Sequence, residues 1–154
     1  AAKAAQEGKN LDQIVDLVHQ TVPQIHMFGK IDDFASLFQG KRFRLTRVLI
    51  LLGEISMALH IKLLGEVYDG GKIRSPAYVI GRNMALNRLK RWAKGYKGIQ
   101  DLAIAYSTIP QEAETLAERL EPLFPRKRIF ITRLGCATST YAGPGTLAMA
   151  LLAD

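Results

Sequence analysis

The sequence predicts an α/β protein in which helices pack on the faces of a mixed β-sheet. Three observations support this fold class. A β-hairpin is indicated over residues 61–80 by the turn Asp69-Gly70-Gly71, because both glycines accept positive φ angles. A β-α-β crossover, expected to be parallel and right-handed, is indicated over residues 102–132. Between them, residues 82–96 show the spacing of an amphipathic helix.

The first part of the chain alternates helix and strand patterns, with capping residues at the boundaries. In order, we expect a helix over residues 11–20 capped by Asn10, with Leu11, Ile14, Val15 and Val18 on one face, a strand over 24–31, a brief helix from Asp32 to Gly40, and a long helix over 45–57.

The second part begins with the hairpin strands, residues 61–68 and 73–80. Pro76 cannot donate to a ladder, so its strand should be an edge or carry a bulge. Of the amphipathic helix we expect Ala85, Leu89, Trp92 and Tyr96 to face inward. The crossover should comprise a strand over 102–106, a helix and a strand over 129–132. We expect Ser107 or Thr108 to cap this helix, Pro110, Glu112 and Glu114 to lie in its first turns, and Pro125 to end it. Its inward-facing residues should be Ala113, Leu116, Ala117 and Leu120.

Length and composition are those of one domain, residues 1–154, with 48% hydrophobic and 23% charged residues. The single cysteine, Cys136, excludes an internal disulfide, fits a reducing cytoplasm, and is expected to be a small buried filler. The apolar run 48–64 is interrupted by charged residues, so we expect a core segment and no transmembrane span. The chain starts at Ala1 with what resembles the end of a helix, so we expect that the upstream part of a longer protein is missing.

The formal net charge of +7 is concentrated in clusters of basic residues. One cluster lies on the amphipathic helix, and we expect Arg88, Lys90, Arg91 and Lys94 to be exposed and unnecessary for folding. Such a surface also fits a module that docks an acidic protein or nucleic acid. No aromatic platform is interleaved with these charges, which disfavours specific nucleic-acid binding.

Sequence patterns of an enzyme or a metal protein are absent. The three histidines are scattered, and no Walker loop, dinucleotide fingerprint or nucleophile elbow occurs. Most carboxylates fall on expected helix surfaces, and Asp32 and Asp33 have the position of a cap. We therefore expect no catalytic residues, no metal and no cofactor.

A candidate site lies in the last seventeen residues, 138–154. Its hydroxyl-bearing loop contains Thr138, Ser139, Thr140 and Tyr141, and leads into the rigid corner Gly143-Pro144-Gly145 and an apolar exit over residues 147–153. Backbone amides and hydroxyls at such a corner suit an anionic head group, with an apolar wall for a tail. An ordinary tight turn before a final buried strand explains the same residues.

Four stretches stand in order from residue 34 to residue 145. They are Phe34-Ala-Ser-Leu-Phe-Gln-Gly40-Lys-Arg42-Phe43, matching L-x-x-L-x-x-G-G-R-I; Leu59-His-Ile61-Lys62 with Val67-Tyr-Asp-Gly-Gly-Lys-Ile73, matching an L-N-I-K-P hairpin; Ile109-Pro-Gln-Glu-Ala-Glu-Thr-Leu-Ala, matching A-P-E-E-A-E-x-L; and Thr140-Tyr-Ala-Gly143-Pro144-Gly145, matching x-H-T-G-P-G. In this order they resemble the C-terminal domain of the DegV family of bacterial fatty-acid-binding proteins.

The resemblance implies a two-domain protein that holds one long-chain fatty acid between its domains and often serves a fatty-acid kinase. It implies that an N-terminal domain, missing here, supplies hydroxyl groups that grip the carboxylate. It also adds Arg42, which matches the arginine of G-G-R, to the expected lipid-binding residues Thr138, Ser139, Thr140, Tyr141, Gly143, Pro144 and Gly145. Four positions depart from the family pattern: Tyr141 and Ala142 replace His and Thr, Lys41 replaces Gly, and Leu63 replaces Pro.

We therefore interpret the chain as a fatty-acid-binding domain that sequesters its ligand without chemistry. The expected partners are a long-chain fatty acid, the missing N-terminal domain and a fatty-acid kinase. An apolar face drawn from residues 48–64 and 147–152 should be exposed, and it would support a homodimer.

Overall fold

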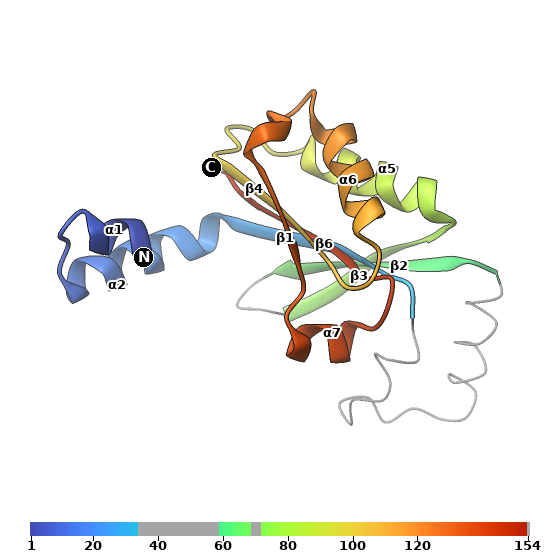
Figure 1. Cartoon of the computed structure of the whole chain (residues 1–154), viewed down its shortest axis with the longest axis horizontal. Coiled ribbons are helices and arrows are strands. Elements are labelled where there is room, and N and C mark those ends of the chain that lie inside the picture. The colour runs from blue at the N-terminus through green and yellow to red at the C-terminus, as the bar shows by residue number, and fades with distance from the viewer. Residues whose placement is uncertain (34–58, 69–71, 154) are drawn as a thin grey trace.

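The computed structural model describes residues 1–33, 59–68 and 72–153 (Figure 1). The strands of these residues form a six-stranded sheet in the order β3-β2-β1-β6-β4-β5. The strands are β1 (Ile25–Ile31), β2 (Ile61–Tyr68), β3 (Lys72–Ile80), β4 (Asp101–Tyr106), β5 (Ile129–Arg133) and β6 (Leu147–Leu152). This confirms the expected mixed sheet, because β4 and β5 are parallel whereas the other neighbours are antiparallel.

The expected hairpin is formed by β2 and β3, and β3 is an edge strand. The pairing of β2 with β3 is irregular between two points: Leu64 pairs with Ala77, but Glu66 pairs with Arg74. The backbone of Pro76 lies between these two pairs, within the irregular stretch. Both features follow from the missing N–H of proline, which cannot take part in a regular inner ladder.

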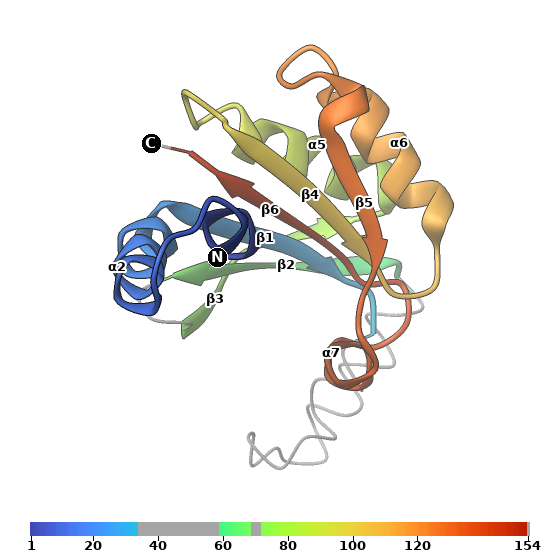
Figure 2. The ribbon, with the colours of Figure 1, turned by 60° about the vertical axis from the view of Figure 1, so that its left-hand side comes forward.

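Helices α5 and α6 lie side by side on one face of the sheet (Figures 1 and 2). A third helix, α7, lies at the end of the sheet where β5 ends and β6 begins. The helices are α1 (Ala2–Gln6), α2 (Leu11–Thr21), α5 (Arg82–Ala93), α6 (Pro110–Leu120) and α7 (Cys136–Ala142), and two short 3₁₀ turns are η1 (Val22–Gln24) and η2 (Arg126–Arg128).

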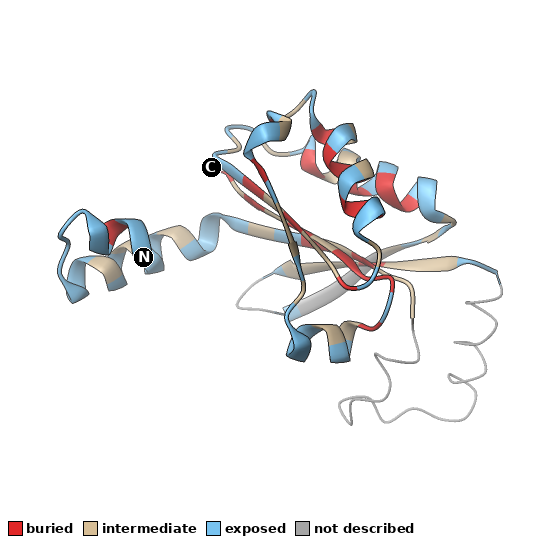
Figure 3. Cartoon of the chain, in the orientation of Figure 1, coloured by how far each residue is buried: buried red, intermediate tan, exposed pale blue. Residues whose placement is uncertain are grey.

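The core lies between the sheet and helices α5 and α6 (Figure 3). On α6 all four residues expected to face inward are fully buried, as are Ala85 and Leu89 on α5. Trp92 and Tyr96 are only partly buried and pack at the margin, whereas Leu86 and Ala93 are buried as well. The apolar face of α5 is therefore wider than a single stripe of helical spacing predicts. Burial of each large side chain stabilises the fold by roughly 1.5–3 kcal/mol.

The N-terminal helices α1 and α2 extend away from the sheet (Figure 1). The expected cap is confirmed: Asn10 Oδ1 accepts the N–H of Gln13 at 2.9 Å, and Gln13 Oε1 accepts the N–H of Asn10 at 3.0 Å. The apolar stripe of α2 is largely exposed in the described part of the chain, with 74% exposure at Leu11. Helical periodicity thus predicted the element correctly, but the described residues do not bury its apolar side.

Several local expectations were wrong or lie outside the described residues. Neither Ser107 nor Thr108 caps α6, whose N-cap is Ile109 with no side-chain bond. The helix ends at Leu120, well before Pro125, and Cys136 is exposed instead of buried. The two helices expected over 32–40 and 45–57 fall almost wholly within residues 34–58, which are not described.

Candidate functional site

The Gly143-Pro144-Gly145 corner lies at one end of the sheet. Strands β1, β4 and β5 end there, and β2 and β6 begin there, as their pairing shows. The stretch before it was expected to be a loop, but residues 136–142 form helix α7. The small and hydroxyl-bearing residues of this stretch tolerate a helix, which then ends at Gly143 with φ 78°.

Side chains from the β4–α6 connection hold the corner in place. Thr108 Oγ1 accepts the N–H of Gly145 at 3.0 Å, and Ser107 Oγ accepts the N–H of Thr146 at 3.0 Å. The N–H of Ser107 in turn donates to the carbonyl of Thr146 at 2.9 Å. The hydroxyls that were expected to cap a helix therefore anchor the corner instead.

The hydroxyl groups of α7 have different roles. Ser139 donates to the carbonyl of Leu134 at 3.2 Å, and Thr140 donates to the carbonyl of Cys136 at 2.8 Å. Thr138 and Tyr141 are exposed, Tyr141 to 63%, and the hydroxyl of neither forms a hydrogen bond with another described residue. Of the four, Thr138 and Tyr141 keep a hydroxyl proton for a ligand. Arg42 lies outside the described residues.

A cluster of charged side chains beside the corner was not anticipated. Lys30 is fully buried, and its ammonium contacts Glu112 Oε2 at 2.5 Å and both carboxylate oxygens of Asp32 at 3.0 and 3.1 Å. Lys62 Nζ lies 2.9 Å from Asp32 Oδ2, and Arg82 Nε lies 3.2 Å from Glu112 Oε1. Glu112 lies in the first turn of α6 as expected, but its carboxylate is not on the helix surface, because only 4% of the residue is exposed.

The sequence held a signal for this cluster. Along β1 the side chains of His26, Phe28 and Lys30 point to the same face, because successive residues of a strand alternate. Phe28 is in the core, so Lys30 had to enter it too, and a buried cation requires a paired carboxylate.

The opposite face of the sheet is largely apolar. Its central strands carry small residues at the outward positions, and larger apolar side chains flank them. The small residues are Gly29, Gly65, Ala103, Ala105, Ala148 and Ala150, and the flanking ones include Met27, Ile31, Leu63, Phe130 and Leu152. Of the apolar face expected from residues 147–152, Ala148, Ala150 and Leu152 are on this side and half-buried, whereas Leu147, Met149 and Leu151 are in the core.

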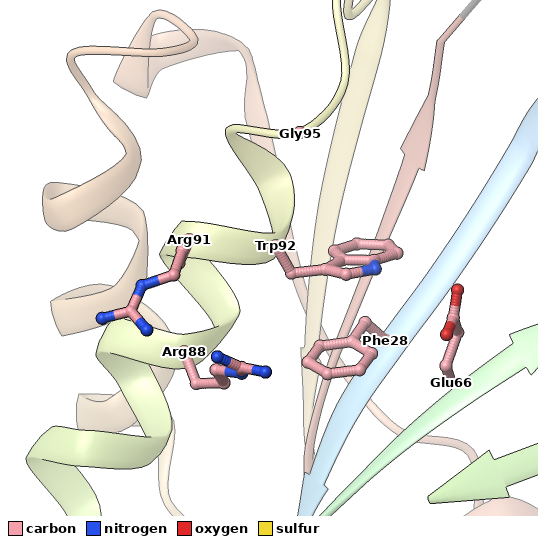
Figure 4. A pocket seen from close by; sticks show the side chains of 6 residues that line it. All are labelled: Phe28, Glu66, Arg88, Arg91, Trp92 and Gly95. Atoms are coloured by element: carbon pink, nitrogen blue, oxygen red, sulfur yellow. The ribbon is translucent and has the colours of Figure 1, made fainter. Parts of the chain in front are cut away.

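A concave feature lies between α5 and strands β1 and β2. It is a groove of about 320 Å³ lined by Phe28, Glu66, Arg88, Arg91, Trp92 and Gly95 (Figure 4). The rings of Phe28 and Trp92 stack at 4.9 Å, with the two arginines on the helix beside them. An adjoining groove of about 360 Å³ shares Arg88 and Arg91.

Among the residues with a described position, no group of His, Cys, Asp and Glu is arranged to hold a metal ion. The helices that the structure describes are also too short or too polar to cross a membrane.

Comparison with known proteins identifies the family. A sequence profile described as "uncharacterised protein, DegV family" matches residues 1–154. The chain belongs to the DegV family. A DegV domain-containing protein of Clostridium perfringens is 30% identical over 159 residues, which cover 100% of this chain and 52% of the relative. This DegV chain thus spans about half the length of the relatives it matches.

Solved structures share the fold. A fatty-acid-binding DegV protein of Streptococcus agalactiae is 25% identical with a TM-score of 0.77, and the match covers 99% of this chain and 53% of that one. The Fatty Acid Kinase B3 protein of Streptococcus pneumoniae, loaded with linoleic acid, is 18% identical with a TM-score of 0.83, covering 99% and 53%. Both matches confirm the α/β fold.

Proposed function

We propose that this chain is the C-terminal domain of a two-domain DegV protein that binds one long-chain fatty acid between its domains. The observation that carries the proposal is the anchored Gly143–Gly145 corner, which lies directly beside an apolar sheet face lined by small residues. Fatty-acid-binding and lipid-loaded proteins of the same fold support it.

In this arrangement the head group lies at the corner and the acyl chain runs along the sheet. Glycine and alanine at the outward positions of β1, β6 and β4 leave room for a chain that larger side chains would fill. Ser139, Thr140 and Thr146 donate their hydroxyl protons to backbone carbonyls. We therefore assign the head-group contacts to the hydroxyls of Thr138 and Tyr141, together with the missing N-terminal domain.

The tail supplies most of the binding free energy. A sixteen-carbon chain gains on the order of 12 kcal/mol gross when buried, at about 0.8 kcal/mol per methylene, before the costs of ordering. One hydrogen bond to the head group contributes about 1 kcal/mol and mainly sets the orientation of the ligand. The protein therefore sequesters its ligand and carries out no reaction on it.

The relative named as a Fatty Acid Kinase B3 protein also supports a role in presenting the acid to a kinase. We place this in the cytoplasm, where the free and exposed Cys136 stays reduced. In the absence of the other domain, the apolar sheet face is expected to pair two copies as a homodimer.

Native mass spectrometry tests the proposal. The full-length protein, purified under mild conditions, should carry an additional mass equal to one long-chain fatty acid, which is released on denaturation. A protein that carries no lipid and takes up none from added palmitate would contradict the proposed function.

The phenol of Tyr141 gives a sharper test of the head-group position. In the full-length protein, Tyr141→Phe should weaken palmitate binding by about 1 kcal/mol, roughly fivefold, because one hydrogen bond is lost. Tyr141→His should hold or improve binding. The control is Tyr96→Phe, a tyrosine at the core margin beside Trp92. Unchanged binding by Tyr141→Phe would show that the ring lines the site without donating a hydrogen bond. Tighter binding by both Tyr141→Phe and Tyr141→Ala would show that the tyrosine side chain blocks the site.

A second function is favoured by the groove on α5. Arg88 and Arg91 are exposed beside the stacked rings of Phe28 and Trp92, and neither forms an ion pair with another described residue. Charge and aromatic surface together suit an acidic protein segment. Such binding should weaken steeply with salt, whereas lipid uptake should hardly respond.

The charges of this groove are expected to be dispensable for folding. Arg88→Glu with Arg91→Glu should change the free energy of unfolding by less than about 0.5 kcal/mol, because both side chains are exposed and only the stripe beneath them is buried. Urea denaturation measures this. A loss of several kcal/mol would mean that the arginines contribute to packing of α5.

A further inference from the structure

The charged cluster beside the corner forms one continuous chain of alternating sign. Its members, in order, are Lys62, Asp32, Lys30, Glu112 and Arg82. Lys62 and Lys30 lie on β2 and β1, and Asp32 directly follows β1. Glu112 and Arg82 lie in the first turns of α6 and α5, so the chain links the sheet to both covering helices. Three cations and two anions leave one net positive charge.

Asp32 is the member that touches the corner. A Cβ atom placed on Gly145 would lie 2.6 Å from Asp32 Oδ2 and 2.9 Å from its Cβ and Cγ atoms. The side chain of Asp32 is therefore packed against the backbone of Gly145. Oδ1 is buried, and although it lies 3.0 Å from Lys30 Nζ, it accepts no hydrogen bond from a described residue.

This position creates an electrostatic problem for an anionic head group. A carboxylate at the corner would meet the carboxylate of Asp32, and like charges at short range repel strongly where the effective dielectric constant is about 20. The C-terminal end of α7, which leads into the corner, adds partial negative charge. The corner accepts an anion only if nearby cations compensate for both.

Lys30 is the cation best placed for this task. It is fully buried, so solvent does not screen its charge, and it holds Asp32 from one side while Lys62 holds it from the other. Glu112 fixes the ammonium at 2.5 Å and is itself fixed by Arg82. The ammonium is thus restrained between two carboxylates on different elements.

We propose that Lys30 is a positioning residue that makes the corner selective for a carboxylate head group, by neutralising Asp32 and holding it against Gly145. The inference rests on the proposed fatty-acid binding. It assigns no contact between Lys30 and the ligand, since the ammonium is buried on the helix-covered face.

The test compares an acid with its ester in the full-length protein. Palmitate and methyl palmitate share the tail, but only palmitate carries a charge. Lys30→Met should weaken palmitate binding by about tenfold or more, and methyl palmitate binding by less than about twofold, because only the charged head group depends on the local potential. Exposed Lys94→Met is the control and should leave both ligands unchanged. Equal losses for acid and ester would overturn the proposal.

A second measurement does not depend on lipid. Hydrogen exchange of the Gly145 and Thr146 amides should accelerate in Lys30→Met relative to amides within β6, because Asp32 is no longer held against the corner. Lys30→Met with Glu112→Gln repeats the test without the unpaired carboxylate, in case the single variant folds poorly.

The outcomes distinguish a failure of the proposed fatty-acid binding from a failure of the positioning role of Lys30. Wild-type protein that binds neither palmitate nor its ester contradicts the proposed function, and the exchange of the corner amides then still decides whether Lys30 positions Asp32. Wild-type protein that prefers palmitate, with the preference and the corner exchange unchanged in both Lys30 variants, overturns the inference alone.

Discussion

Glu112→Ala is expected to lower the free energy of unfolding by about 3 kcal/mol. The substitution removes the closest partner of a fully buried ammonium, and Asp32 is then the carboxylate that still pairs with Lys30 among the described residues. Breaking a buried ion pair costs about 3–5 kcal/mol, and the low end applies because one carboxylate remains. The helix also loses an acidic residue from its first turn, where it interacts favourably with the helix dipole.

Glu114→Ala is a matched control on the same helix. Glu114 also forms an ion pair with an arginine, Arg126, but its side chain is 53% exposed. An exposed pair contributes at most about 1 kcal/mol, so the control should lose less than that. Urea denaturation of the two variants measures the difference. Equal destabilisation would show that the buried position of Glu112 confers no special role on it.

Gly145→Ala is expected to destabilise the protein by about 2 kcal/mol. The φ angle of Gly145 is +75°, which costs an L-residue about 1–2 kcal/mol. The new methyl group would also overlap the Asp32 carboxylate, which cannot move aside without breaking its contacts with Lys30 and Lys62. Because Asp32 and the corner shift together, fatty-acid binding should weaken as well.

Gly135→Ala is the corresponding control. Gly135 precedes α7 with φ −61°, and a Cβ atom there meets nothing within 4 Å. We expect a change in unfolding free energy below about 0.5 kcal/mol, as for an unstrained surface site. If Gly145→Ala were as harmless as this control, Asp32 would not be held against the corner, and the positioning role of Lys30 would lose its basis.

The sequence alone predicted the type and place of most elements in the described part of the chain, but not the order of the strands in the sheet. Hairpin, crossover and final strand follow from local signals in the sequence, namely the Gly70-Gly71 pair between the two hairpin strands, a proline at the start of α6, and short apolar runs between polar boundaries. These signals act over a few residues, so they can be seen without knowledge of distant parts of the chain. The corner was located for the same reason, since Gly143 and Gly145 both have the positive φ angles that their residue type permits.

Only the tertiary structure decided what surrounds the corner. Ser107 and Thr108 looked like helix caps, yet they bind amides 39 and 37 residues away in sequence, respectively. Glu112 looked like a surface residue, yet the strand position of Lys30, 82 residues earlier, draws its carboxylate into the core. A polar side chain takes whichever partner the fold brings within hydrogen-bond distance, and that distance depends on how strands pair. Strand pairing joins residues that are far apart in sequence, so the residues near each of these positions could not predict its hydrogen-bond partner.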